Sequence, residues 1–172
     1  RGGLHITTLT SRTAETIMCE KYDYMLKVEN AEEDIKSMVK AIQENCPKKI
    51  LKRSESLAEE YYRFKRKEKD DYPYFLSSPN IFRKRGKEEI ERCKMCGLSV
   101  FEDLEDLLNA IKKFKYLPPV VYVIRAEAIK IRKVGEIYHT PSIDRASHRT
   151  FFPCANYNSE DVWEVYKEIR KL

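Results

Sequence analysis

The chain has 172 residues, which is enough to bury a hydrophobic core without help from metals or disulfides. Hydrophobic residues make up 42% of it and charged residues 35%, a composition that excludes a disordered chain. The formal net charge of +5 permits an anionic partner without requiring one. Composition therefore predicts a single domain over residues 1–172.

The N-terminal part predicts two strands followed by a helix. Apolar and β-branched residues alternate over residues 4–9 and again over residues 18–28, as expected for strands. Asn30, with Glu33 three residues later, has the spacing of a capping box at a helix start. Cys46-Pro47 then ends the helix, because proline cannot continue it.

A second helix is expected directly after the first. Ser54 or Ser56 would cap it, and its apolar stripe continues to about Lys69. The two helices together predict a helical hairpin subdomain over residues 30–69. The second helix ends in a basic run, and another basic cluster follows at Arg83, Lys84 and Arg85. Such runs are either solvated faces or phosphate-contacting patches.

The clearest pattern of the chain is a strand, a helix and a strand in its central third. Residues 98–101 follow a glycine and form a short apolar run. Residues 103–115 repeat leucine, isoleucine and phenylalanine at helical spacing, with acidic residues at the start and lysines at the end. Residues 120–124 are uniformly apolar, which indicates a strand buried on both faces. If both strands share one sheet, the connection is expected to be right-handed.

The C-terminal part predicts two more strands, a loop and a helix. Residues 129–134 alternate apolar and basic side chains, and residues 136–140 form another β-rich run. A loop over residues 141–158 follows, and Ser159 would cap a final helix. Taken together, the elements predict an α+β fold with a mixed, mainly antiparallel sheet and four to five flanking helices.

The end of this loop concentrates charged and aromatic side chains. His148 lies close in sequence to Arg145 and Arg149, and neighbouring positive charge disfavours a protonated imidazole. A neutral histidine can act as a general base, arginine can bind phosphate through two hydrogen bonds, and Phe151 and Phe152 can stack on a base. The alternative interpretation is structural, with a histidine that hydrogen-bonds the backbone and arginines that are solvated.

Five cysteines form an odd count, which we interpret as reduced thiols of a cytoplasmic protein. No stretch has the pattern of a signal peptide or the roughly 18–20 apolar residues of a membrane helix. Cys93 and Cys96 form a lone C-x-x-C pair, and a zinc site would need two more ligands from Cys154, His148 or His139. We favour small hydrophobic residues beside a turn, and predict no metal and no cofactor.

Two histidine triplets, His5-Ile6-Thr7 and His148-Arg149-Thr150, resemble the paired motifs of the two-histidine phosphoesterases, which act on phosphate esters of RNA. The resemblance implies that His5 and His148 act as acid and base and that Thr150 binds phosphate. His148 lacks the apolar flanks that surround His5, so the match is closer at the first triplet.

From residue 74 to residue 153 the chain resembles a group of small uncharacterised prokaryotic proteins. The matching segments are Phe75-Leu76-Ser77, Gly97-Leu98-Ser99-Val100-Phe101, the helix 103–115, residues 120–124 and His148-Arg149-Thr150-Phe151-Phe152. Their layout is similar to toxin-like ADP-ribosyltransferases. That likeness implies roles for Ser77, Ser78 and either Glu127 or Glu136 around nicotinamide dinucleotide.

Three functions therefore stay open. The favoured one is a toxin-like or defence-like enzyme acting on RNA or a phosphate-bearing nucleotide. Its catalytic residues would be His148, Thr150 and His5, and its substrate-binding residues Arg145, Arg149, Phe151, Phe152, Arg83 and Arg85. The second is a non-catalytic module that binds nucleic acid or a protein partner, and the third is an ADP-ribosyltransferase-like toxin. None of the three involves a membrane.

Overall fold

The computed structural model describes residues 19–24, 28, 31–66, 88–113, 121–157 and 159–172. Its centre is a seven-stranded sheet in the order β1-β5-β6-β3-β2-β4-β7, and every neighbouring pair is antiparallel. The strands are β1 Lys52–Arg53, β2 Glu60–Arg66, β3 Leu98–Phe101, β4 Val121–Glu127, β5 Gly135–His139, β6 His148–Pro153 and β7 Tyr166–Lys171. The predicted α+β class with a mainly antiparallel sheet is confirmed.

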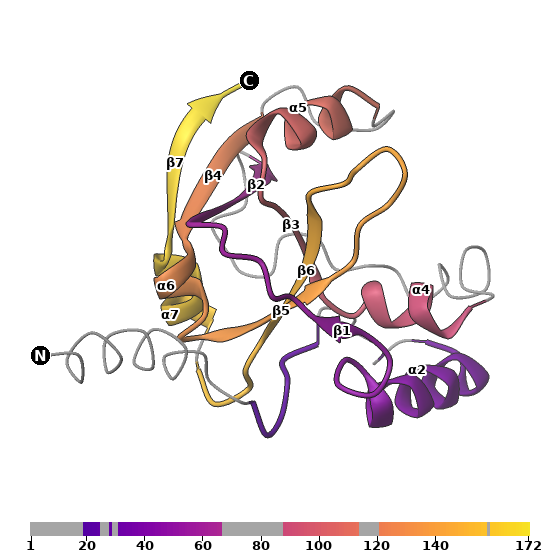
Figure 1. Ribbon diagram of the computed structural model, residues 1–172. Coiled ribbons are helices and arrows are strands. Elements are labelled where there is room, and N and C mark those ends of the chain that lie inside the picture. Colours follow the sequence, from indigo (N-terminus) through magenta and orange to yellow (C-terminus); the bar gives the residue numbers. More distant parts are fainter. Residues whose placement is uncertain (1–18, 25–27, 29–30, 67–87, 114–120, 158) are drawn as a thin grey trace, which may run out of the picture.

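Helices cover both faces of this sheet (Figure 1). They are α2 Glu33–Asn45, α4 Glu89–Lys94, α5 Leu104–Lys113, α6 Ala128–Ile131 and α7 Ser159–Glu164. Within the described ranges, none of them has the length and apolar character needed to cross a bilayer. Helices α2 and α4 contact each other and pack near β5 and β6, whereas α5 packs on the central strands β2 and β3.

The core is divided between the two faces. On one face, side chains of the central strands pack with α6 and α7 through residues such as Ile131 and Val162. The opposite face carries two separate clusters. One packs α2 and α4 against Phe152 and Tyr138, and the other packs α5 against Phe101. This division leaves room between the two clusters of the second face.

The central strand, helix and strand agree with the prediction. Strands β3 and β4 both pair antiparallel with β2, so they run parallel to each other with one strand between them. Helix α5 connects them and begins with Glu105 and Asp106 and ends with Lys112 and Lys113, as its charge pattern predicted. The predicted strand 136–140 is also present as β5.

The predicted helix from Ser54 to Lys69 is wrong, and with it the helical hairpin over residues 30–69. In the described part of this segment, which ends at residue 66, residues 60–66 form β2, one of the central strands. Its burial alternates: Tyr61, Arg63 and Lys65 are buried, whereas Tyr62 and Phe64 are partly exposed. This period of two is the pattern of a strand, and the aromatic residues have high β propensity.

Three further expectations near the C-terminus need correction. The predicted strand 129–134 contains the short helix α6, because Ala128, Ile131 and Val134 are buried at a spacing of three residues. The predicted final helix stops at Glu164 and continues as β7, which pairs with β4. The predicted loop 141–158 contains β6, a fully buried strand.

Of the strand predicted at 18–28, the described residues show only a bridge between Tyr22 and Cys154.

Four of the five cysteines form disulfides, so the prediction of five reduced thiols is wrong. Cys46, just after α2, pairs with Cys93 in α4 and joins the two helices. Cys19 pairs with Cys154 and attaches the N-terminal segment to the end of β6. Cys96 is free and buried, and burial raises the pKa of its thiol to about 12. The C-x-x-C pair is therefore split between a disulfide and a core thiol.

This pairing predicts a definite alkylation pattern. Denatured but unreduced protein should take up one iodoacetamide, at Cys96, and reduced protein should take up five. Peptide mapping by mass spectrometry checks both the count and the partners. Uptake of five labels without reductant would contradict the disulfides.

Candidate functional site

The candidate site lies on strands β3 and β6, where they pair. Their register places Ser99 opposite Thr150 and Phe101 opposite His148. Side chains alternate along a strand, so these four residues share one face of the sheet. It is the face with the two separate clusters, and Phe101 belongs to the cluster under α5.

His148 is held on both sides of its imidazole ring. Nδ1 lies 2.8 Å from the carbonyl oxygen of Thr140, and Nε2 lies 3.0 Å from the hydroxyl oxygen of Ser99. A carbonyl can only accept, so Nδ1 carries the proton and donates it to Thr140. Nε2 is then the acceptor, and the Ser99 hydroxyl donates to it. The ring also makes an edge contact with Phe101, with centroids 5.2 Å apart.

Burial makes this histidine a neutral base. His148 is 9% exposed, and burial lowers the pKa of its imidazole to about 4. The hydrogen bond to the Thr140 carbonyl raises the pKa, whereas the charges of Lys94, Arg145 and Arg149 lower it further. The sequence predicted a neutral imidazole because of the arginines. The direction is confirmed, but burial is the larger cause.

A cavity of about 440 Å³ opens beside His148 and Ser99, between the two clusters of this face. Its wall includes Met95, which packs on the α2–α4 cluster, and Phe64 and Phe101 of the α5 cluster. The charged residues of the wall are Arg63, Lys94, Arg145 and Glu91. Among the described residues of the wall, three cations stand against one carboxylate, so this part of the wall has a net positive charge.

Each cation of the wall comes from a different element. Lys94 ends α4 and pairs with Glu91 at 3.0 Å. Arg145 closes a tight turn, since its backbone exchanges two hydrogen bonds with that of Ser142. Arg63 is buried on β2 and donates to the carbonyl of Ser99 at 3.4 Å. Strands β2 and β3 pair at a single residue pair, Tyr62 with Phe101. The Ser99 carbonyl therefore accepts a hydrogen bond from the Arg63 side chain where a longer ladder would supply a backbone amide.

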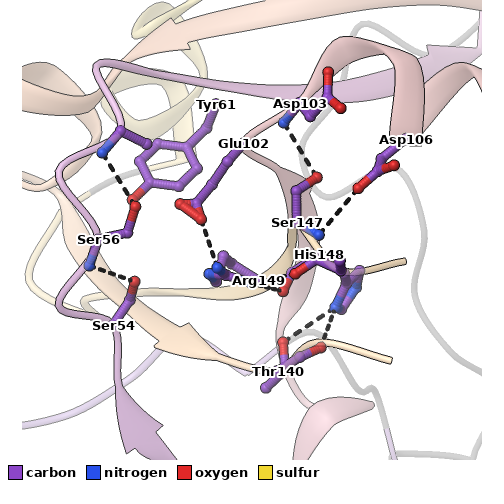
Figure 2. A network of polar contacts seen from close by, with 12 residues as sticks. Ser54, Ser56, Tyr61, Glu102, Asp103, Asp106, Thr140, Ser147, His148 and Arg149 are labelled. Atoms are coloured by element: carbon purple, nitrogen blue, oxygen red, sulfur yellow. Dashed lines mark hydrogen bonds and ion pairs between the residues drawn. The ribbon is translucent and has the colours of Figure 1, made fainter. Parts of the chain in front are cut away.

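The segment before His148 is tied to the start of α5 (Figure 2). The amide of Ser147 donates to Asp106 at 3.0 Å, and the amide of Asp103 donates to the Ser147 hydroxyl at 3.2 Å. The amide of Glu102 also donates to the Ser147 carbonyl. These bonds fix the chain on which His148 sits before it enters β6, so the histidine is positioned from two directions.

Arg149 points away from His148, as neighbours on a strand must (Figure 2), and it is not among the described residues of the cavity wall. It forms an ion pair with Glu102 at 2.6 Å and donates to the carbonyl oxygens of Ala146 and His148. Both charged side chains of the pair are largely buried. Arg149 therefore stabilises the start of β6. This position does not fit its predicted role as a phosphate ligand in the same site as His148.

The other predicted site residues divide into two groups. Phe151 and Phe152 are both 0% exposed, on opposite faces of β6, so their predicted stacking on a base does not fit their position in the core. Thr150 is also buried, and its hydroxyl lies 2.8 Å from that of Thr140 instead of lining the cavity. The remaining predictions lie outside the described residues; they concern His5, Arg83, Arg85, Ser77 and Ser78.

Neither glutamate singled out from the sequence reaches the cavity. Glu127 is exposed at the end of β4, where its pair with Lys130 lowers the pKa of its carboxyl. Glu136 is fully buried and accepts hydrogen bonds from the hydroxyls of Tyr22 and Tyr138. In the described part of the chain, no cluster of three or more His, Cys, Asp or Glu side chains could hold a metal.

Four residues of the site were missed in the sequence: Ser99, Thr140, Arg63 and Lys94. Ser99 stands as the one polar residue in an apolar strand, and that was a usable signal. Arg63 was assigned to a basic helix end because β2 was mistaken for a helix. Comparison with known proteins adds nothing to these assignments, since no family model, curated protein or solved structure matches the chain.

The buried histidine predicts a pH-dependent stability. The pKa of His148 is about 4 in the folded state and near 6.5 when exposed, so the unfolded chain binds the proton more readily between these values. The free energy of unfolding should fall by about 3 kcal/mol as the pH drops from 6.5 to 4. Urea unfolding across this range measures it, and His148→Gln should remove this part of the slope. Parallel curves for the two proteins would contradict the burial of a neutral imidazole.

Proposed function

We propose that the protein is an enzyme that acts on a phosphate ester of RNA or of a nucleotide bound in the cavity beside His148. The observation that carries this proposal is a neutral imidazole beside a cavity with three cations in its wall. Cations attract and bind phosphate, and a neutral imidazole can accept a proton from an attacking hydroxyl. The cavity volume of about 440 Å³ lies in the range of small-ligand sites.

The roles follow from the contacts. The Thr140 carbonyl holds the proton of the imidazole on Nδ1, so Nε2, which lies beside the Ser99 hydroxyl of the cavity wall, can accept the proton of the attacking hydroxyl. The same nitrogen then returns the proton to the leaving oxygen, as general base and acid in turn. The negative charge of the phosphate is offset by Arg145, Lys94 and Arg63. This electrostatic stabilisation is stronger in a partly enclosed site than in bulk water.

A module that only binds phosphate is the second candidate, because the cations alone would suffice for it. The two candidates differ in His148: catalysis needs its Nε2, whereas binding does not. The expected resemblance to ADP-ribosyltransferases gains no support from the cavity, whose described wall contains neither Glu127 nor Glu136.

The location of the protein stays a prediction. A cytoplasmic location was expected from the cysteine count, but two disulfides favour an oxidising compartment, since reducing conditions keep most thiols free. The proposed chemistry needs no particular compartment.

The two arginines of this segment predict opposite effects on binding and stability. Arg145→Ala should weaken binding of a short RNA or nucleoside monophosphate about tenfold, because a charge-assisted contact is lost, and leave unfolding nearly unchanged. Arg149→Met should destabilise the fold by about 3 kcal/mol, because it leaves Glu102 buried without its partner. Calorimetric titration and urea unfolding measure the two effects.

Two further variants serve as a control for charge and as the test for catalysis. Lys167→Ala removes an equal charge from exposed β7, outside the cavity wall, and should change neither quantity. His148→Gln should retain binding and lose cleavage by about a hundredfold or more. Binding without any cleavage by the wild type would favour the non-catalytic module, and no binding of either ligand would contradict the proposed function.

A further inference from the structure

Ser99 carries a hydroxyl that the proposed function does not yet use. It is exposed on β3 between two buried neighbours, Leu98 and Val100, and it lies in the wall of the cavity. Its backbone is fixed on one side by pairing with β6 and on the other by Arg63. The paired strand thus presents the Ser99 hydroxyl to the cavity.

The hydroxyl of Ser99 belongs to a chain of three groups. The Thr140 carbonyl accepts from Nδ1 of His148, and Nε2 of His148 accepts from Ser99 Oγ at 3.0 Å. A nucleophile, a base and a group that orients the base form the arrangement by which enzymes activate a serine. Here a backbone carbonyl occupies the orienting position that a carboxylate holds in the familiar triads.

We propose that Ser99 is the nucleophile of the site and that it accepts the phosphoryl group in a covalent intermediate. This inference rests on the proposed function and specifies its reaction. The geometry favours Ser99 over a bound water or a hydroxyl of the substrate. Its Oγ already occupies the hydrogen-bonding position on Nε2, which any other nucleophile would have to take over.

The proposed step balances in atoms and charge. Ser99 Oγ forms a bond to phosphorus as its proton passes to His148 Nε2, and the bond from phosphorus to the leaving oxygen breaks. Nε2 gives the proton to that oxygen. Water then attacks the phosphoserine ester, its proton passes to Nε2, and the Oγ–P bond breaks as Ser99 Oγ recovers a proton. The products are an alcohol and a phosphate, and no oxidant or metal takes part in the balance.

A serine nucleophile predicts that the enzyme cleaves RNA and DNA alike. An enzyme that relies on the 2′-hydroxyl of RNA as nucleophile cannot cleave DNA. A serine nucleophile does not need that hydroxyl, so matched RNA and DNA oligonucleotides should be cleaved at rates within about tenfold of each other. A substrate-assisted mechanism predicts cleavage of RNA alone.

The first test uses a fluorophosphonate probe, which reacts with activated serines, on the intact disulfide-bonded protein. Mass spectrometry should find one adduct on Ser99 in the wild type. Ser99→Ala should give none at that position, and His148→Gln should react about a hundredfold more slowly. Ser37→Ala, an exposed serine on α2, is the matched control and should react like the wild type. No adduct on Ser99 of the folded wild type would overturn the inference.

The second test separates this inference from the proposed function. Ser99→Ala should bind the RNA oligonucleotide like the wild type and lose cleavage of both RNA and DNA. If Ser99→Ala still cleaves RNA while His148→Gln does not, the inference fails and the proposed function stands. If the wild type binds neither oligonucleotide, the proposed function fails, and the probe alone decides whether Ser99 is activated. Urea unfolding confirms that each variant is folded.

Discussion

The pairing of β3 with β6 is the contact on which the rest of the structure depends. It joins two segments that lie far apart in the sequence, and its register sets Ser99 and His148 on one face. It also buries Phe151 and Phe152 in the cores of the two faces. The approach is so close that a Cβ at Gly97 would collide with Thr150 and Phe152. Core packing and the geometry of the site therefore come from one set of backbone hydrogen bonds.

Burial allows a base and several cations to share one site. A histidine near three positive charges could be kept neutral by those charges alone, but a bound phosphate would then cancel them and let the imidazole take a proton. Here burial is the largest cause of the lowered pKa, so neutrality depends less on whether the cavity is occupied. In the proposed function, the cations of the wall bind the phosphate while Nε2 of His148 remains the proton acceptor, with the ring held by the Thr140 carbonyl.

The sequence predicted the fold class and the central strand, helix and strand because there the local pattern and the tertiary contacts agree. The prediction failed at β2, where Ser54 and Ser56 resemble helix caps. Their hydroxyls do accept hydrogen bonds from backbone amides two residues later, but in turns that lead into a strand. Of the site, His148 and Arg145 could be found from their clustering in sequence. Ser99 could be noticed as a polar residue in an apolar strand, but its place beside the histidine could not be predicted. The same holds for Arg63 and Thr140, because only the folded sheet brings these residues to His148. The disulfides also depend on proximity that no spacing reveals.

The opposite directions of His148 and Arg149 have a consequence for how this chain can vary. The partner of His148 is the buried Thr140 on one side of the sheet, and the partner of Arg149 is the largely buried Glu102 on the other. A single residue inserted or deleted within β6 would exchange the two faces, set a guanidinium against Ser99 and leave Glu102 facing an imidazole. Length changes in the turn between Ser142 and Arg145 would avoid this exchange as long as Ser147 stayed attached to α5. Natural variants should therefore differ in the length of that turn and keep the length of the strand.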